Sequence, residues 1–277
     1  MKQPLFSILI ANYNNGKYLM DAIDSVRQQT YGNWEIVLVD DASTDNSEEL
    51  YVELEKDERI HICRNEKNMG CGYTKRRCAE LANGEICGFL DPDDVLLPNA
   101  VEDSAKNLHE HSESVLSFSR FYICDADMNV TRECRKLDLH GKSYFENQDY
   151  CPEHFVAFRK EAYDKTDGVD ALLKAGVDQD LYFRLEEVGG IAIMDKFTYK
   201  YRVVDGSVSR EDRKSYFWNQ VARINTCERR GLPVDRYVYP DFVEFCEHEK
   251  RSGAEAVRGS KAYKLGKQLL KPFKKNS

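Results

Sequence analysis

Three aspartates follow an apolar run in the segment GFLDPDDVLLP, residues 88–98. Asp91, Asp93 and Asp94 would emerge together where a buried strand ends, because Pro92 fixes its own backbone and keeps the preceding residue out of helical conformation. Carboxylates this close repel one another unless a cation lies among them, and their hard oxygen atoms suit Mg²⁺ or Mn²⁺. The segment therefore predicts a metal site that could hold a diphosphate, with an ordinary Asp- and Pro-rich turn as the alternative.

Two other groups of polar residues could contact the same ligand. Asp40 and Asp41 end the apolar run WEIVLVDD, where a carboxylate could accept a hydrogen bond from a base or a ribose hydroxyl. Lys75, Arg76 and Arg77 occupy the first exposed turn of a predicted helix, where cations could meet phosphate. A solvated helical face is the simpler interpretation of these three cations.

Asp178 and Asp180 stand at the start of the amphipathic segment VDQDLYFRLEEVG, residues 177–189. Acidic residues in the first turn of a helix interact favourably with its dipole and cap its free amides. Capping alone would explain both residues. A carboxylate at the mouth of a site could also take a proton from an attacking hydroxyl as general base.

The elements that must position these residues alternate between strands and helices. Apolar runs and helical periodicities between residues 5 and 91 predict the order β-α-β-α-β-α-β. This alternation is typical of a largely parallel sheet with helices on its faces, where ligands bind outside the carboxyl ends of the strands. Polar residues stand at those ends, at 12–15, 40–41 and 91–94, so we expect one edge of the sheet to hold the site.

The pattern becomes less regular after residue 114. The segments SVLSFSRFYIC and HFVAFRK are strand-like, and two helices are predicted after residue 210, in REDRKSYFWNQVARINTCERRG and YPDFVEFCEHEKR. We therefore divide the chain into an α/β domain, residues 1–209, and a helical C-terminal extension with a basic tail, residues 210–277.

Composition narrows the class of protein. A chain of 277 residues with 42% hydrophobic content can bury a sizeable core. The nine cysteines are scattered and include no Cys-x-x-Cys pair, which is typical of reduced thiols in the cytosol. Neither a signal peptide nor an apolar run of about 18 residues is apparent, so we expect a cytoplasmic protein without a transmembrane helix.

The charge of the chain is unevenly distributed. The formal net charge is −8 and residues 256–277 contribute +7, so residues 1–255 carry −15. An acidic body argues against nucleic acid as a partner, because nucleic-acid binding depends on neutralising phosphates.

Together these segments resemble the family-2 glycosyltransferases of the GT-A fold. The family's pieces occur in order over residues 4–209, as SILIANYNNGKYLMDAIDSVRQQTYGNWEIVLVDDASTDNS, NMGCGYTKRRCAELANGEICGFLDPDD, VDQDLYFRL and YRVVDGSVS. The resemblance implies an α/β, Rossmann-like GT-A fold with a mostly parallel central sheet flanked by helices. It also implies transfer of a sugar from a nucleotide-diphosphate donor, most often a UDP-sugar, to an acceptor hydroxyl with inversion at the anomeric carbon.

The resemblance further implies a biological role and a set of site residues. The role is bacterial-type polysaccharide, lipopolysaccharide or capsule biosynthesis, with a glycan or glycolipid as acceptor. Asp178 matches the catalytic base, and Asp93, with Asp91 and Asp94 beside it, matches the ligands of Mn²⁺ or Mg²⁺. The residues expected to contact the donor are Ala11, Tyr13, Asp40, Asp41, Lys75, Asp91 and Pro92.

Four positions depart from the family pattern. Ala11 stands where many members have proline, and Gly16 where many have glutamate. Val177 replaces an acidic neighbour of the base, and Val204 replaces a frequent histidine. These departures leave three points open: the contacts to the base of the donor, the way in which Asp178 is held, and the full set of metal ligands.

Two other functions fit parts of the sequence. FLDPDDV matches the haloacid-dehalogenase phosphatase signature, in which Asp91 would be the nucleophile and Asp93 the acid and base beside Mg²⁺. That signature usually opens a domain, whereas three strand-like runs precede it here. The departures at Val177 and Val204 make a non-catalytic nucleotide-sugar-binding subunit the other alternative.

The basic tail, residues 258–275, could form a helix with lysines on one side and apolar residues on another. Such a helix would lie at a membrane interface, attracted to anionic lipid on the inner face. A glycine and a proline weaken the helix, so a solvated terminus is the alternative.

Overall fold

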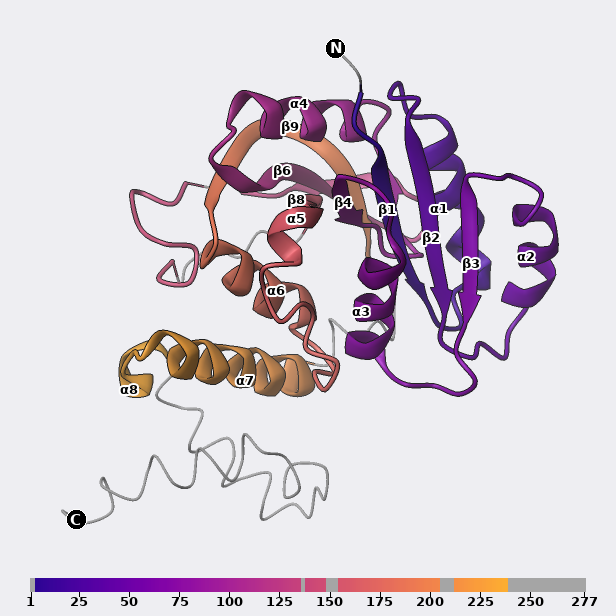
Figure 1. Ribbon diagram of the computed structural model, residues 1–277. Coiled ribbons are helices and arrows are strands. Elements are labelled where there is room, and N and C mark those ends of the chain that lie inside the picture. Colours follow the sequence, from indigo (N-terminus) through magenta and orange to yellow (C-terminus); the bar gives the residue numbers. More distant parts are fainter. Residues whose placement is uncertain (1–2, 136–137, 148–153, 205–211, 239–277) are drawn as a thin grey trace.

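The fold is organised around a curled sheet with helices on both faces (Figure 1). The computed structural model describes residues 3–135, 138–147, 154–204 and 212–238. The N-terminal half alternates between strands and helices, in the order β1 (Phe6–Asn12), α1 (Gly16–Arg27), β2 (Trp34–Asp40), α2 (Ser47–Leu54), β3 (Ile60–Arg64), α3 (Cys71–Leu81) and β4 (Ile86–Phe89). The predicted order of these elements is confirmed.

The second half is less regular, as the sequence indicated. It contains β5 (Val95–Leu96), α4 (Ala100–Glu110), β6 (Ser114–Cys124), β7 (Val130–Glu133), β8 (Val156–Arg159), α5 (Lys160–Tyr163), α6 (Val177–Glu186), β9 (Gly190–Arg202), α7 (Asp212–Arg230) and α8 (Val234–Tyr237). The segments SVLSFSRFYIC and HFVAFRK supply β6 and β8, so both strand predictions are confirmed.

The sheet is parallel in its first part and mixed in its second. Its strand order is β3-β2-β1-β4-β8-β6-β9-β5, and β7 pairs with β6 outside this path. β1 is parallel to β2 and β4, and β2 is parallel to β3. β8 is antiparallel to both β4 and β6, whereas β9 is parallel to β6 and antiparallel to β5. The prediction of a parallel sheet thus holds for β1 to β4. The later strands extend this sheet through both parallel and antiparallel pairs.

The register of the parallel strands brings the predicted polar residues to one edge. Asn12 at the end of β1 is paired with Asp40 at the end of β2. Leu9 of β1 is paired with Phe89 of β4, so the residues that follow β4 emerge at the same edge. All seven residues of β2 are buried, as expected for a parallel strand that is covered by helices on both faces.

Two hydrophobic clusters fill the space between the sheet and its helices. One cluster contains side chains of α1, α2 and α4, and the other contains side chains of α3, α5, α6 and α7. Figure 1 shows α3, α5 and α6 in front of the sheet and α7 packed below α6. The described part of the C-terminal extension therefore shares its core with α6.

Some predictions lie outside the described residues. They are the second C-terminal helix, YPDFVEFCEHEKR, the basic tail at 258–275 and the domain boundary between 209 and 210. Among the residues that the structure describes, no helix has the length and apolar character needed to cross a membrane.

Candidate active site

The loop that follows β4, residues 91–94 and here called the acid-rich loop, is anchored by β9. The Tyr199 hydroxyl donates to Asp94 Oδ2 at 2.8 Å, and the Arg202 amide donates to Asp94 Oδ1 at 2.7 Å. The Nε of Arg202 donates to the Asp93 carbonyl oxygen, also at 2.7 Å. The Asp94 side chain is completely buried and Pro92 is buried beside it. The loop is therefore a fixed part of the sheet edge.

The acid-rich loop gathers more negative charge than its surroundings neutralise. Burial raises the pKa of Asp93 to about 6, and the nearby charge of Asp91 acts in the same direction. Burial also raises the pKa of Asp94 well above its usual value, again supported by its acidic neighbours. Both shifts show that a further positive charge would be stabilised here.

The raised pKa of Asp93 leads to a prediction about stability in the absence of divalent ions. The unfolded carboxyl group loses its proton near pH 4, whereas the folded one keeps it until about pH 6. The contribution of Asp93 to the free energy of unfolding should therefore fall as the pH rises through this window, by at most about 3 kcal/mol. Urea unfolding of the wild type and of Asp93→Asn at pH 4, 5 and 6 isolates this contribution. The stability of the wild type relative to the variant should fall from pH 4 to pH 6, and a constant difference would contradict the assignment.

Lys75 on α3 joins the acid-rich loop to α6. Its Nζ lies 3.1 Å from Asp91 Oδ1 and 2.8 Å from Asp178 Oδ2. Burial alone would lower the pKa of Lys75, but the carboxylates of Asp178 and Asp91 raise it well above its usual value. Burial opposes the charge on Asp91 as well, yet Lys75 holds the pKa of Asp91 below its usual value. One ammonium group thus pairs with two carboxylates from different elements.

The expectation that Lys75 lies in an exposed turn is wrong. Its side chain is only 6% exposed, because α3 begins at Cys71 and turns residue 75 toward the sheet edge. Arg76 pairs with Glu80 and donates to the Val169 carbonyl, and Arg77 donates to the Arg64 carbonyl. These two arginines support neighbouring loops, so of the three predicted cations Lys75 alone contacts Asp91 and Asp178.

We predict that Lys75→Met lowers stability in a pH-dependent way. At pH 7 the change leaves two carboxylates without their cation, and because each is about one third exposed we expect a loss of about 1–2 kcal/mol. The stabilisation of Asp91 by Lys75 is present above about pH 4 and is lost as the pH falls through the lowered pKa of Asp91. Urea unfolding at pH 7 and pH 3 should show a smaller difference between variant and wild type at pH 3. A constant difference would argue against the pairing.

Asp40 and Asp41 are engaged by the protein itself. Asp40 accepts from the Tyr51 hydroxyl at 2.6 Å and from the Ser43 amide at 2.9 Å. Asp41 accepts from the Asn65 side chain at 2.7 Å and from the Met69 and Gly70 amides at 2.8 Å. Both aspartates are buried, so they shape the two loops at this edge while keeping some acceptor capacity.

Two other predicted donor contacts lie at the end of β1. Tyr13 is 45% exposed in the connection between β1 and α1, and Ala11 is half-buried in β1. This connection is tied to the β2–α2 loop, because the Asn14 side-chain oxygen accepts from the Thr44 amide at 2.7 Å. The exposed ring of Tyr13 therefore projects from a fixed loop beside the engaged aspartates.

His154 lies beside the acid-rich loop, and the sequence analysis did not identify it. Within the described part of the chain, ligand atoms of Asp91, Asp94 and His154 lie within 4.8 Å of one another, in a group that does not include Asp93. Burial lowers the pKa of His154 to about 4, although the charge of Asp91 opposes this shift. Two carboxylates and a neutral imidazole form a donor set that suits Mn²⁺, so the side chains present fit the ion that the resemblance implies.

Asp178 lies in the first turn of α6, and Lys75 determines how it is held. Val177, which replaces an acidic residue of the family, is buried in the hydrophobic cluster beneath α6. Lys75 Nζ donates to both carboxylate oxygens of Asp178, at 2.9 and 2.8 Å. About one third of the Asp178 side chain stays exposed, so the carboxylate can still be reached by a ligand.

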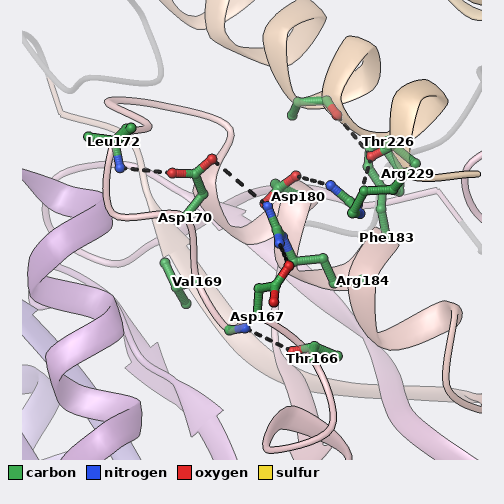
Figure 2. Close-up of polar contacts among 12 residues, drawn as sticks. Thr166, Asp167, Val169, Asp170, Leu172, Asp180, Phe183, Arg184, Thr226 and Arg229 are labelled. Atoms are coloured by element: carbon green, nitrogen blue, oxygen red, sulfur yellow. Dashed lines mark hydrogen bonds and ion pairs between the residues drawn. The ribbon is translucent and has the colours of Figure 1, made fainter.

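Asp180 has a different role from the capping predicted for it. Its carboxylate is fully buried, 2.6 Å from Arg184 Nε and 3.4 Å from Arg229 Nη1 on α7. Figure 2 shows Asp180 between these two arginines, with Arg184 also facing Asp170 in the loop before α6. This network of ion pairs fixes α6 between α7 and the preceding loop, and it therefore fixes the helix that carries Asp178.

Comparisons with known proteins give the family and the fold of the chain. Residues 7–167 match the family model described as glycosyl transferase family 2. The chain is 26% identical over 247 residues to a chondroitin synthase from Escherichia coli, which covers 82% of this chain but 36% of the relative. It is 28% identical over 210 residues to an uncharacterized glycosyltransferase from Methanocaldococcus jannaschii, covering 73% of this chain and 72% of the relative. The chain thus spans about a third of the length of the synthase.

Solved structures share the fold. A structure of TarS residues 1–349 from S. aureus in complex with UDP-GlcNAc superimposes with a TM-score of 0.66 at 18% identity, covering 93% of this chain and 78% of that fragment. The mannosyltransferase PcManGT from Pyrobaculum calidifontis, in complex with GDP-Man and Mn²⁺, superimposes with a TM-score of 0.65 at 15% identity, covering 99% and 83%. Both are GT-A glycosyltransferases.

The family match spans more than half of the chain and includes β1 to β4 and the acid-rich loop. It supports the glycosyltransferase prediction and gives no support to the phosphatase alternative. With its mixed α/β sheet and its GT-A architecture, the chain belongs to glycosyl transferase family 2.

Proposed function

We propose that this chain transfers a sugar from a nucleotide-diphosphate donor to an acceptor hydroxyl with inversion of the anomeric centre. The observation that carries the proposal is the link between Asp178 and the acid-rich loop through Lys75. A partly exposed carboxylate on α6 lies beside the acidic end of β4, with contacts of 2.8 and 3.1 Å to one buried ammonium group. A proton acceptor and a site for a diphosphate thus meet at the edge of the sheet.

The proposed reaction is a single displacement. The acceptor oxygen forms a bond to the anomeric carbon while the bond between that carbon and the diphosphate oxygen breaks. Asp178 accepts the hydroxyl proton, and the bonding electrons leave with the nucleoside diphosphate. One base is sufficient for inversion, whereas a retaining reaction through a covalent intermediate requires a second carboxylate as nucleophile.

Lys75 and the acid-rich loop are proposed to bind the diphosphate of the donor. The Lys75 ammonium is charged, buried and positioned to meet a phosphate oxygen. The sequence predicts that the ligands of a divalent ion, Mn²⁺ or Mg²⁺, come from among the carboxylates of this loop, Asp91, Asp93 and Asp94. When bound, such an ion stabilises the negative charge that develops on the departing diphosphate.

The donor and acceptor classes are proposed from the relatives. TarS structures contain UDP or UDP-GlcNAc, and the PcManGT structure contains GDP-Man. Curated relatives include the chondroitin synthase and two proteins named as putative biosynthesis glycosyltransferases for teichuronic acid and colanic acid. We therefore propose a UDP-sugar donor and a glycan or glycolipid acceptor in polysaccharide biosynthesis.

A donor screen tests this proposal. Melting temperatures of the wild type should be measured with UDP-sugars and GDP-mannose, each with and without Mn²⁺. A ligand at 100 times its dissociation constant stabilises the folded state by about 2.7 kcal/mol, so a true donor should raise the melting temperature clearly. If no UDP-sugar raises it in the presence of Mn²⁺, the proposed donor class is wrong.

Transfer assays with the best donor separate an enzyme from a non-catalytic binding subunit. Release of nucleoside diphosphate should depend on an acceptor glycan, and a product with inverted configuration should be visible by NMR. A wild-type protein that binds a donor but transfers nothing across a broad acceptor panel would favour the binding subunit.

Three other expectations from the sequence remain predictions. They are the domain division at 209/210, the membrane contact of residues 258–275 and the location at the inner face of the membrane.

A further inference from the structure

We propose that His154 is a ligand of the divalent ion, so that the ion is held by one imidazole nitrogen together with the carboxylates of Asp91 and Asp94. The inference deepens the proposed function, because the ion belongs to the same donor site. Its basis is the approach of these three ligand atoms to within 4.8 Å of one another. The three residues come from two connections of the sheet, the one after β4 and the one before β8.

The strand topology explains why His154 reaches this site. β8 runs antiparallel to β4, with Ala157 paired with Gly88. His154 and Phe155, which directly precede β8, therefore lie at the same edge as the residues that follow β4. His154 is thus placed beside Asp91 by the backbone of the sheet.

The orientation of the His154 ring is fixed by aromatic side chains. The ring stacks on Tyr199 and Tyr201 of β9, with centroid distances of 4.8 Å in both cases and interplanar angles of 8° and 13°. Phe121 of β6 meets the ring edge-on at 5.5 Å and 89°. Residues 199 and 201 are two apart on a strand and therefore face the same side of the sheet. Packing therefore fixes the direction of the ring nitrogens before an ion binds, so that binding costs little further rotational freedom of the ring.

The same strand fixes the carboxylate ligand that lies deepest. The Tyr199 hydroxyl donates to Asp94 Oδ2, and the Arg202 amide donates to Oδ1. Each oxygen accepts one of these hydrogen bonds and keeps a further lone pair for an ion. β9 therefore orients two of the three proposed ligands, which is the supporting arrangement expected around a metal site.

Packing alone does not explain why a histidine occupies this position. A phenylalanine would fill the same slot between the tyrosines, but it would bring no lone pair toward Asp91 and Asp94. The group of three side chains does not include the Asp93 carboxylate. Asp93 contacts Arg202 through its main-chain carbonyl oxygen. We therefore assign the third ligand to His154 in place of Asp93, the residue to which the acidic motif alone points.

The substitution His154→Phe tests the assignment, because it keeps an aromatic ring in the stack and removes the nitrogen. His109→Phe, at an exposed histidine on α4, is the matched control. Mn²⁺ binding in the presence of UDP should be measured by calorimetry and by electron paramagnetic resonance of free Mn²⁺. We expect the dissociation constant of His154→Phe to rise about 10-fold or more, and that of the control to equal the wild-type value. Wild-type Mn²⁺ affinity in His154→Phe would overturn the assignment.

The wild-type spectrum in pulsed electron paramagnetic resonance gives a readout that does not depend on how well the variant folds. Bound Mn²⁺ in the wild type should show modulation from a directly bonded imidazole nitrogen, and this signal should vanish in His154→Phe. A wild-type spectrum without nitrogen modulation, or modulation that persists in the variant, would overturn the assignment. Transfer assays on the same samples separate the two proposals: sugar transfer without a nitrogen ligand refutes the role of His154 alone, and a nitrogen ligand without transfer refutes the function alone.

Discussion

Asp178→Asn is expected to reduce sugar transfer by about 10² to 10⁴-fold, because the amide cannot accept the proton of the acceptor hydroxyl. Donor binding should persist, since Lys75 keeps its contact with Asp91 at 3.1 Å. The measurement is nucleoside diphosphate release at saturating donor, together with the melting-temperature shift that the donor causes. A large loss of transfer with an unchanged shift would place Asp178 in the chemical step.

The matched control is Asp24→Asn on α1. The Asp24 carboxylate is about half exposed and pairs with Arg27 one turn away, outside the site described above. This variant should transfer sugar at the wild-type rate. Full activity of Asp178→Asn would refute its role as the base, and a lost donor shift in that variant would show that Asp178 acts in binding instead.

Arg184→Met is expected to lower the free energy of unfolding by about 3 kcal/mol at pH 7. The change removes the closest partner of a fully buried carboxylate, and breaking a buried ion pair in this way typically costs about 3–5 kcal/mol. Arg229 stays 3.4 Å from Asp180 and should reduce the loss toward the lower limit. Urea unfolding followed by circular dichroism measures the change.

Arg27→Met provides the comparison for an exposed arginine. Arg27 and Asp24 form an i,i+3 pair at the surface of α1, and such pairs contribute less than about 1 kcal/mol. If Arg184→Met and Arg27→Met lower stability by the same small amount, Asp180 does not depend on Arg184. A large loss for Arg184→Met alone would confirm that ion pairs fix α6 in the fold (Figure 2).

The parallel part of the fold could be predicted from the sequence because its signals are local. Strands β1, β2 and β4 are short apolar runs, and each is followed by polar residues that the parallel register brings to one edge. The acid-rich loop could be placed at that edge for the same reason. Local periodicity and the rule for ligand sites in α/β sheets were sufficient here.

The position of Lys75 could not be predicted in the same way. The sequence shows three consecutive cations on a helix, and their spacing does not reveal which one faces the sheet. The structure buries Lys75 against Asp91 and Asp178, and the latter lies 103 positions later in the chain. Pairing over such a distance depends on how the sheet places α3 relative to α6, which a local pattern does not encode.

His154 was missed because the strand that follows it changes direction. A parallel arrangement would have placed the start of HFVAFRK, where His154 stands, at the opposite edge of the sheet, far from the acid-rich loop. The antiparallel pairing of β8 with β4 reverses this placement. Strand direction is decided by the connections between strands, so a histidine before an apolar run carried no visible signal.

The anchoring of the acid-rich loop by β9 also has a consequence for the order in which the protein is made. The segment that matches the family ends at residue 167, after the acid-rich loop but before Asp178, Tyr199 and Arg202. A nascent chain of that length would contain the acids of the loop without the donors that hold Asp94 and the Asp93 carbonyl. The site is therefore completed late in synthesis, when β9 has emerged and paired with β6, and a fragment cut at the family boundary would not be a working unit.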